Sequence, residues 1–327
     1  MSILLAIPAL LTAAPPHRVG HAALGRRALL SRSALALGAS AVASPACAIL
    51  GGEAVTNKEA ASAGAVGLYI DVSGCSVCRK DLPATCSGTL VGPDLALSAR
   101  HCIDVPRELN GTLTKVVFGA DIRDARAPSR AVEKIVTTAD YGINSEGSDL
   151  VLIKLSSPAP PEWRPVELPL GLLPVKAEEA EAKRLNSPFY PDGLGFPQLV
   201  TYGYGQQSTN GAIDASDYSA GALRRLPVQA RTEIRPWAPA FLATPTSTST
   251  GTCAGDSGGA ALAVLQDPQG RGLRQLLLGV QALASIPCED NQAIYVYPDA
   301  FGDFLLRAST DLGSPLRPTL SWRDYVR

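Results

Sequence analysis

Short apolar stretches, separated by turn-forming residues, make up most of the chain from residue 49 onward. Each stretch is rich in apolar and β-branched residues and is bounded by Gly, Pro or Asp, a pattern typical of β-strands. Six of them are Gly67–Val72, Gly88–Leu97, Lys115–Phe118, Leu150–Leu155, Gln198–Tyr202 and Gln275–Val280. Many short strands joined by tight turns predict an all-β barrel or sandwich and argue against a helical bundle.

One segment near the C-terminus has the spacing of a helix. Phe301, Phe304 and Leu305 recur at helical intervals, which predicts a helix over about 299–308 that packs on the core. Residues 309–327 have no such pattern, and we expect an irregular tail there.

Two further segments interrupt the strand pattern. The Pro-rich stretch Pro158–Pro165 predicts a connection between two halves of the domain. Ala177–Leu185 is rich in Ala, Glu and Lys and predicts a helical turn in an inserted surface loop. The sequence assigns no role to this insertion or to the polar loop Gln206–Asp217.

The first 48 residues have the composition of a targeting sequence. No acidic residue precedes Glu53, whereas four arginines occur, two of them as the twin-arginine pair Arg26-Arg27. Ala46-Cys47-Ala48 places small residues at the positions that a signal peptidase reads. We therefore expect residues 1–48 to be removed and the protein to be exported, to the periplasm or outside the cell. Two apolar runs separated by a basic zone also resemble presequences for a plastid or thylakoid lumen, which is the alternative.

The charge balance excludes several classes of partner. Lys and Arg total 29 against 30 Asp and Glu, a net charge of −1. Removal of residues 1–48 takes away four arginines and no acid, so the mature chain becomes more acidic. Nucleic acids and anionic membranes call for a basic surface, so we expect neither as a partner. No apolar run is long enough to span a bilayer, and we expect a monomeric mature chain.

Six cysteines remain after removal of the presequence, and an even number in an exported chain favours disulfides. They are Cys75, Cys78, Cys86, Cys102, Cys253 and Cys288, which allow 15 pairings. The Cys75-x-x-Cys78 motif is also compatible with a redox site or half of a zinc site. A zinc site needs a second pair at similar spacing, and none occurs. We therefore expect no metal, and favour a local disulfide between Cys75 and Cys78.

Three further features suggest nucleophilic catalysis. His101 is the only histidine left in the mature chain, Asp149 precedes an apolar strand, and Ser257 lies in Gly255-Asp256-Ser257-Gly258-Gly259. Acyl transfer needs a hydroxyl, a base that deprotonates it and a group that orients the base. Taken singly, each feature has a plain structural explanation: a lone core histidine, a turn-capping acid and a flexible turn.

Together these residues resemble the trypsin/chymotrypsin family of serine endopeptidases, in which histidine, aspartate and serine follow one another in this order. Four other segments match family patterns: Ile49-Leu50-Gly51-Gly52, Cys86–Val91 with His101-Cys102, Tyr202-Gly203-Tyr204-Gly205, and Ala293–Tyr297 followed by Asp299–Arg307. The resemblance spans roughly 49–308. It implies two six-stranded antiparallel β-barrels, the first over about 49–160 and the second over about 165–298, followed by the C-terminal helix.

The resemblance also implies roles. Ser257 is expected to be the nucleophile, His101 the general base and then acid, and Asp149 the group that orients the imidazole. The backbone N–H groups of Gly255 and Ser257 are expected to form the oxyanion hole. The family pairings imply disulfides Cys86–Cys102 and Cys253–Cys288, which leaves Cys75–Cys78. A polypeptide substrate is implied, a protein inhibitor is a further candidate partner, and no cofactor is required.

Activation is expected to involve the new N-terminus. In this family the α-amino group of the mature first residue, here Ile49, pairs with the carboxylate beside the nucleophile, here Asp256. Most relatives expose that amine by cleavage after a basic residue, whereas Ile49 follows Ala48 at the end of the small-residue motif. We therefore expect the exporting peptidase itself to activate the enzyme; trimming by a second protease is the alternative.

The residues of the substrate pocket can be predicted by aligning the sequence around Ser257 with the family pattern. Its base falls on Gly251, where trypsin-like members carry aspartate, so a preference for Arg or Lys is not expected. Ala284 and Ala293 replace glycines of the walls, while Ala282 and Leu283 replace a common Ser-Trp pair. The extra methyl groups narrow the slot and predict small or medium apolar side chains at the cleavage site.

Three other functions remain open at this point: a catalytically silent member that serves as a binding module, a redox or metal protein that uses Cys75 and Cys78, and an esterase. Silent members usually lose one of the three catalytic residues, and all three are present here.

Overall fold

A computed structural model describes residues 49–76, 84–145, 147–170, 198–206, 220–231, 240–266 and 272–317. Residues 1–48, Cys78, the predicted helical turn over 177–185, most of the loop 206–217 and the last ten residues lie outside the described residues. None of the helices within these ranges is long and apolar enough to cross a membrane.

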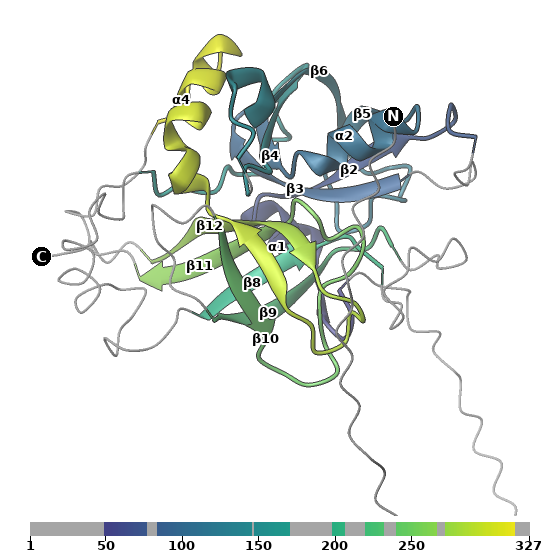
Figure 1. Cartoon of the computed structure of the whole chain (residues 1–327), viewed down its shortest axis with the longest axis vertical. Coiled ribbons are helices and arrows are strands. Elements are labelled where there is room, and N and C mark those ends of the chain that lie inside the picture. The colour runs from purple at the N-terminus through teal and green to yellow at the C-terminus, as the bar shows by residue number, and fades with distance from the viewer. Residues whose placement is uncertain are drawn as a thin grey trace, which may run out of the picture. The chain divides into compact units, whose positions relative to one another are not determined.

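Six strands form the first barrel (Figure 1). In spatial order they are β2 (Ala65–Asp71), β3 (Ala84–Gly92), β4 (Leu95–Ser98), β7 (Val151–Leu155), β6 (Ser129–Thr137) and β5 (Thr112–Val117), with β5 pairing back to β2. Neighbouring strands are antiparallel. The apolar side chains of β4 and β7 are almost completely buried, as expected of strands that line a closed interior.

Six strands also close the second barrel, because β8 pairs with β9 as well as with β11. In order they are β8 (Gln198–Gly203), β9 (Arg224–Ala230), β10 (Ala240–Pro245), β13 (Ala293–Val296), β12 (Leu273–Ala284) and β11 (Ala260–Gln266). The two-residue strand β1 (Glu53–Ala54) pairs with β9 and so attaches the segment after Ile49 to this barrel.

Helices are few and short. They are α1 (Asn57–Ser62), α2 (His101–Glu108), α4 (Gly302–Asp311) and the 3₁₀ turns η1 (Thr138–Tyr141) and η2 (Pro298–Phe301). A capping box between Thr56 and Glu59 starts α1, because each side chain accepts a backbone N–H from the other residue.

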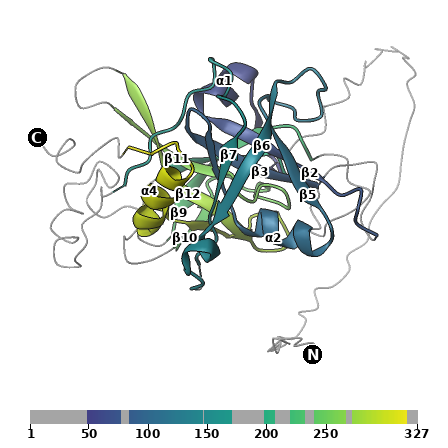
Figure 2. The ribbon, with the colours of Figure 1, turned by 90° about the horizontal axis from the view of Figure 1, so that it is seen from above.

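The last helix, α4, packs against the first barrel although it follows the second one in the chain (Figure 2). Phe304 and Leu305 are buried, and the Phe304 ring meets Tyr141 of η1 edge to face at 5.4 Å between centroids. The Tyr141 hydroxyl also donates to the carboxylate of Asp311. Helix α4 therefore links the end of the chain to the turn that precedes β7.

The predicted fold class is confirmed: two closed six-stranded antiparallel barrels with a C-terminal helix. One predicted strand, Gly88–Leu97, is in fact part of a hairpin, because the turn Pro93-Asp94 separates β3 from β4. Proline lacks the N–H that a continuous strand would donate to its neighbour, which explains why the strand stops there.

Disulfides join Cys86 to Cys102 and Cys253 to Cys288, the two pairings that the resemblance implies. Cys75 is also disulfide-bonded, while its expected partner Cys78 lies outside the described residues.

Candidate active site

The imidazole of His101 is held by a single carboxylate. His101 opens α2, directly after β4, and the Cys86–Cys102 disulfide fixes this turn to β3. One oxygen of Asp149, Oδ1, accepts the His101 backbone N–H at 2.8 Å, and the other, Oδ2, lies 2.6 Å from Nδ1. Since a carboxylate can only accept, Nδ1 carries the proton, and Nε2 of the neutral ring is left as the base.

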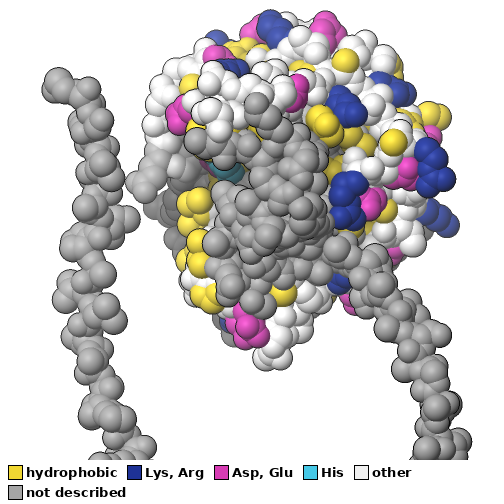
Figure 3. Space-filling model, turned by 90° about the vertical axis from the view of Figure 1, so that its right-hand side faces the viewer, with side chains coloured by type: hydrophobic (Ala, Val, Ile, Leu, Met, Phe, Trp, Pro, Cys, Tyr) yellow, Lys and Arg dark blue, Asp and Glu magenta, His cyan; other side chains and the backbone are white. Residues whose placement is uncertain are grey.

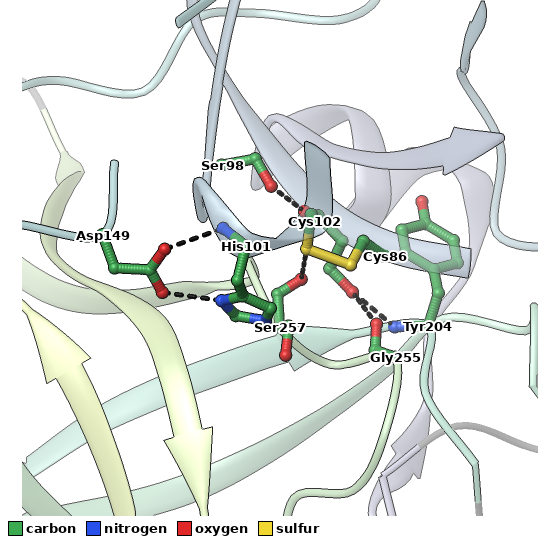
Figure 4. The surroundings of a disulfide bond; sticks show 9 residues. Cys86, Ser98, His101, Cys102, Asp149, Tyr204, Gly255 and Ser257 are labelled. Carbon is green, nitrogen blue, oxygen red and sulfur yellow. Dashed lines mark hydrogen bonds and ion pairs between the residues drawn. A yellow bond between two sulfur atoms is a disulfide. The ribbon is translucent and has the colours of Figure 1, made fainter. Parts of the chain in front are cut away.

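Ser257 lies on the other side of the imidazole from Asp149 (Figure 4). Its carbonyl oxygen accepts the N–H of Ser87 at 2.8 Å and lies 3.6 Å from Sγ of Cys102. The next residue, Gly258, packs so closely on the strand before His101 that an added Cβ would come within 2.0 Å of Oγ of Ser98. The serine is thus fixed to the same turn that carries the histidine.

This site is open to solvent on one side. The side chain of His101 is 34% exposed and that of Asp149 is 23% exposed. The histidine in Figure 3 is visible at the surface, and His101 is the only histidine among the described residues. The imidazole edge is therefore accessible from the surface.

Two backbone N–H groups are available beside the serine. Within the described part of the chain, neither the N–H of Gly255 nor that of Ser257 has an acceptor. The peptide before Gly255 is fixed, because the carbonyl of Ala254 accepts the N–H of Gln206 at 2.8 Å and turns the Gly255 N–H the opposite way. Gly255 has φ +95°, and a Cβ there would lie 2.9 Å from Cα of Gly205. Only glycine fits this turn without strain.

The protein-family comparison can now be set beside this geometry. The family model for Trypsin matches residues 74–304, more than two thirds of the chain. The chain belongs to the trypsin family. Membership supports a serine protease-like function, for which the substrates are polypeptides. The matched range includes His101, Asp149 and Ser257.

In this trypsin-family domain a buried carboxylate, that of Asp256, directly precedes Ser257. Asp256 is fully buried, and its two oxygens accept the N–H groups of Gly205 and Cys253, each at 2.7 Å. Burial raises the pKa of Asp256 to about 7, because loss of water outweighs the two N–H donors that favour the charged form. The site therefore favours a positive partner for this carboxylate.

Ile49 docks on the same barrel. Its side chain is fully buried in a cluster that includes Tyr295, whose pKa is raised mainly by burial and further by the charge of Asp256. The carbonyl of the next residue, Leu50, accepts the N–H of Gly251 at 3.1 Å. These contacts place the expected new N-terminus beside the loop that leads to Ser257.

The pocket residues predicted from the sequence lie at the ends of β12 and β13. Ala284 and Ala293 are direct partners across these strands, while Leu283 is 62% exposed and Ala282 is buried in the core. At Gly251 an added Cβ would lie 1.7 Å from the carbonyl oxygen of Cys288. The backbone carbonyl of Cys288 therefore occupies the space that a side chain at position 251 would need.

Sequence reasoning missed Ser87, which the structure places between the two barrels. Oγ of Ser87 donates to the carbonyl of Gly255 and accepts the N–H of Tyr204, both at 2.9 Å. The side chain is buried, and Ser87 directly follows Cys86, whose disulfide was expected. A serine beside this cysteine was the available signal, but only the fold shows that it reaches a residue 168 positions away.

Replacement of Ser87 by alanine is expected to lower kcat about 10- to 100-fold, with a smaller change in KM. The variant leaves the buried Tyr204 N–H without an acceptor and frees the Gly255 carbonyl, a loss of about 1–3 kcal/mol. Steady-state kinetics on a peptide substrate measure the effect. Ser309→Ala is the matched control, since Ser309 is equally buried but lies in α4. Equal kcat values for Ser87→Ala and Ser309→Ala would contradict the positioning role.

Proposed function

We propose that this protein is a serine endopeptidase that uses Ser257, His101 and Asp149. The observation that carries the proposal is the double contact of Asp149 with both the backbone and the ring of His101. That arrangement fixes the ring position and the tautomer together, which a merely structural histidine does not need. The free N–H groups of Gly255 and Ser257 add a place for a developing oxyanion.

The reaction follows from these positions. Oγ of Ser257 attacks the substrate carbonyl carbon while Nε2 of His101 takes the hydroxyl proton. The negative charge that forms on the carbonyl oxygen is stabilised by the N–H groups of Gly255 and Ser257. His101 then gives its proton to the leaving amine, and the peptide bond breaks. A water molecule then gives a proton to Nε2 of His101 and bonds through its oxygen to the acyl carbon; the ester bond to Ser257 breaks, and His101 returns the proton to Oγ.

The expected pocket limits which residue can precede the cleaved bond. Gly251 carries no charge, and the Cys288 backbone blocks its base, so long basic side chains are excluded. Ala284 and Ala293 narrow the walls. Small or medium uncharged side chains are the proposed substrates.

Activation is proposed to be part of export. Cleavage after Ala48 would free the α-amino group of Ile49, and protonation of that amine would supply the positive partner that Asp256 favours. The burial of Ile49 and the raised pKa of Asp256 support this proposal. The disulfides are consistent with an extracellular protease. Export, whether to the cell exterior, the periplasm or a plastid lumen, is proposed from residues 1–48.

Mass spectrometry of the exported protein after treatment with a fluorophosphonate probe tests the proposal. We expect one probe adduct, on Ser257, in a chain that starts at Ile49, and no adduct on the Ser257→Ala variant. Ser309→Ala serves as the matched control and is expected to be labelled like the wild type. A folded chain that takes no label would instead be a catalytically silent binding module.

A further inference from the structure

Thr252 and Gln281, close to the expected pocket, each carry one buried polar atom that has no hydrogen-bond partner among the described residues. We propose that Thr252 and Gln281 select a substrate side chain that is neutral and carries both a hydrogen-bond donor and an acceptor, with asparagine as the best fit. The inference rests on the proposed peptidase function and names the substrate class of that same site. It replaces the apolar preference that the two wall alanines predict when they are considered alone.

Thr252 directly follows Gly251 at the base of the pocket and is 1% exposed. Its backbone is held on both sides by the carboxamide of Asn291: Oδ1 accepts the Thr252 N–H at 3.3 Å, and Nδ2 donates to the Thr252 carbonyl at 2.6 Å. The same Nδ2 lies 3.1 Å from the carbonyl of Ser285, the residue after Ala284. Asn291 thereby fixes Thr252 to the open ends of β12 and β13.

Gln281 lies in β12, directly beside the nucleophile. Its N–H donates to the carbonyl of Gly259 at 2.9 Å, and its carbonyl accepts the N–H of Gly258 at 2.7 Å. Its side chain is 1% exposed. The position is therefore fixed by two backbone bonds to the residues that follow Ser257.

The strand register puts Gln281 on the pocket wall. Gln281 is opposite Tyr295 and Ala284 is opposite Ala293, with a bulge in β12 between them. Residues 293 and 295 share a face, because side chains alternate along a strand, and directly opposed residues share a face across a pair. Gln281 therefore lies on the same face as the two wall alanines.

Neither Oγ1 of Thr252 nor Oε1 of Gln281 has a hydrogen-bond partner among the described residues, although both atoms are buried. The other buried atoms of this kind belong to Thr89, Arg224 and Gln275, none of which is among the pocket residues identified above. Leaving a buried polar atom unpaired destabilises a fold, and valine or methionine would fill the same space without that loss. Two such atoms at one pocket therefore indicate that a ligand completes their hydrogen bonds.

A carboxamide has the matching chemistry. Its N–H can donate to Oε1 of Gln281 while its oxygen accepts the hydroxyl proton of Thr252. The residues assigned to the pocket carry no charge, which disfavours Asp, Glu, Lys and Arg in a site that excludes water. Asparagine is preferred to glutamine, because the Cys288 carbonyl closes the base at Gly251.

Kinetics on peptides that differ only in the residue before the cleaved bond test this inference. Asparagine and leucine have nearly the same size, and we expect kcat/KM to be about 10- to 100-fold higher for asparagine. Aspartate, which has the shape of asparagine but a charge, is expected to be cleaved more slowly than either. A wild-type preference for leucine or alanine would overturn the inference.

Variants that keep the shape of each side chain but remove its polar atoms test whether Thr252 and Gln281 cause the selectivity. In Thr252→Val and Gln281→Met, the asparagine-to-leucine ratio is expected to fall about 10-fold or more in each, and both proteins are expected to unfold at the same temperature as the wild type or higher. Thr310→Val, in α4, is the matched control and keeps the wild-type ratio. An unchanged ratio in both pocket variants would contradict the roles of Thr252 and Gln281. Loss of probe labelling at Ser257 in the wild type would instead refute the peptidase function itself.

Discussion

His101→Ala is expected to lower kcat by a factor on the order of 10⁶, and Asp149→Asn by about 10⁴. The first change removes the proposed base for the Ser257 proton. The second leaves the size of the side chain unchanged but puts an amide where Nδ1 of His101 needs an acceptor, so the ring adopts the wrong tautomer. Hydrolysis of a peptide with asparagine or alanine before the cleaved bond, followed at enzyme concentrations high enough to see slow turnover, measures both effects.

The double variant distinguishes a catalytic unit from two independent contributions. We expect it to be about as slow as His101→Ala alone, because without the base there is nothing left for Asp149 to orient. Asp303→Asn is the matched control, since Asp303 is an exposed carboxylate on α4. A kcat for Asp149→Asn within tenfold of that control would exclude the proposed role of Asp149.

A chain that retains Ala48 before Ile49 is expected to be about 10²- to 10³-fold less active than one that starts at Ile49. The extra residue removes the charged amine that would pair with Asp256, and the loss of one partner of a buried ion pair costs about 3–5 kcal/mol. Asp256→Asn is expected to bring both chains to the same low activity. Full activity of the longer chain would show that the segment Gly255–Ser257 keeps its working conformation without an ion pair between the Ile49 amine and Asp256.

The pH dependence of stability gives a second test of the buried Asp256 carboxylate. In the unprocessed chain, the pKa of Asp256 is raised from 3.8 to about 7, so the folded state binds the proton more tightly than the unfolded state. The contribution of Asp256 to stability is therefore fully present below about pH 4 and is lost as pH rises from there through about 7, by up to about 4 kcal/mol. Denaturant unfolding at pH 5 and pH 8 should show more than half of this loss in the full chain and a smaller loss in Asp256→Asn.

Local sequence patterns predicted an all-β fold and the C-terminal helix, whereas the arrangement in two barrels was implied by the family resemblance. Apolar stretches bounded by Gly, Pro and Asp coincide with β2, β5, β7, β8 and β12, and Phe304 and Leu305 are buried as their helical spacing predicts. The one misread stretch, Gly88–Leu97, contains the turn that separates β3 from β4. Its apolar residues continue on both sides of Pro93, so hydrophobicity alone did not show the break.

The site depends on contacts that no local pattern reveals. The sequence predicts that Gly251 leaves the pocket uncharged, but only the folded chain brings the Cys288 carbonyl against it. Ser87 and Gly255 are 168 residues apart, and their contact requires both barrels to be in place. Thr252 and Gln281 were overlooked because a threonine and a glutamine in apolar surroundings give no chemical signal until their missing partners are known.

The docking of α4 on the first barrel has a consequence for the order of biosynthesis. The turn η1, which α4 contacts through Tyr141, also holds the residue before Asp149: Oγ1 of Thr138 donates to the carbonyl of Ser148. Since α4 follows both barrels and ends at Asp311, this support for Ser148 is in place only after both barrels have been synthesised. A nascent chain that has not yet reached α4 therefore lacks the contact that steadies the segment before Asp149.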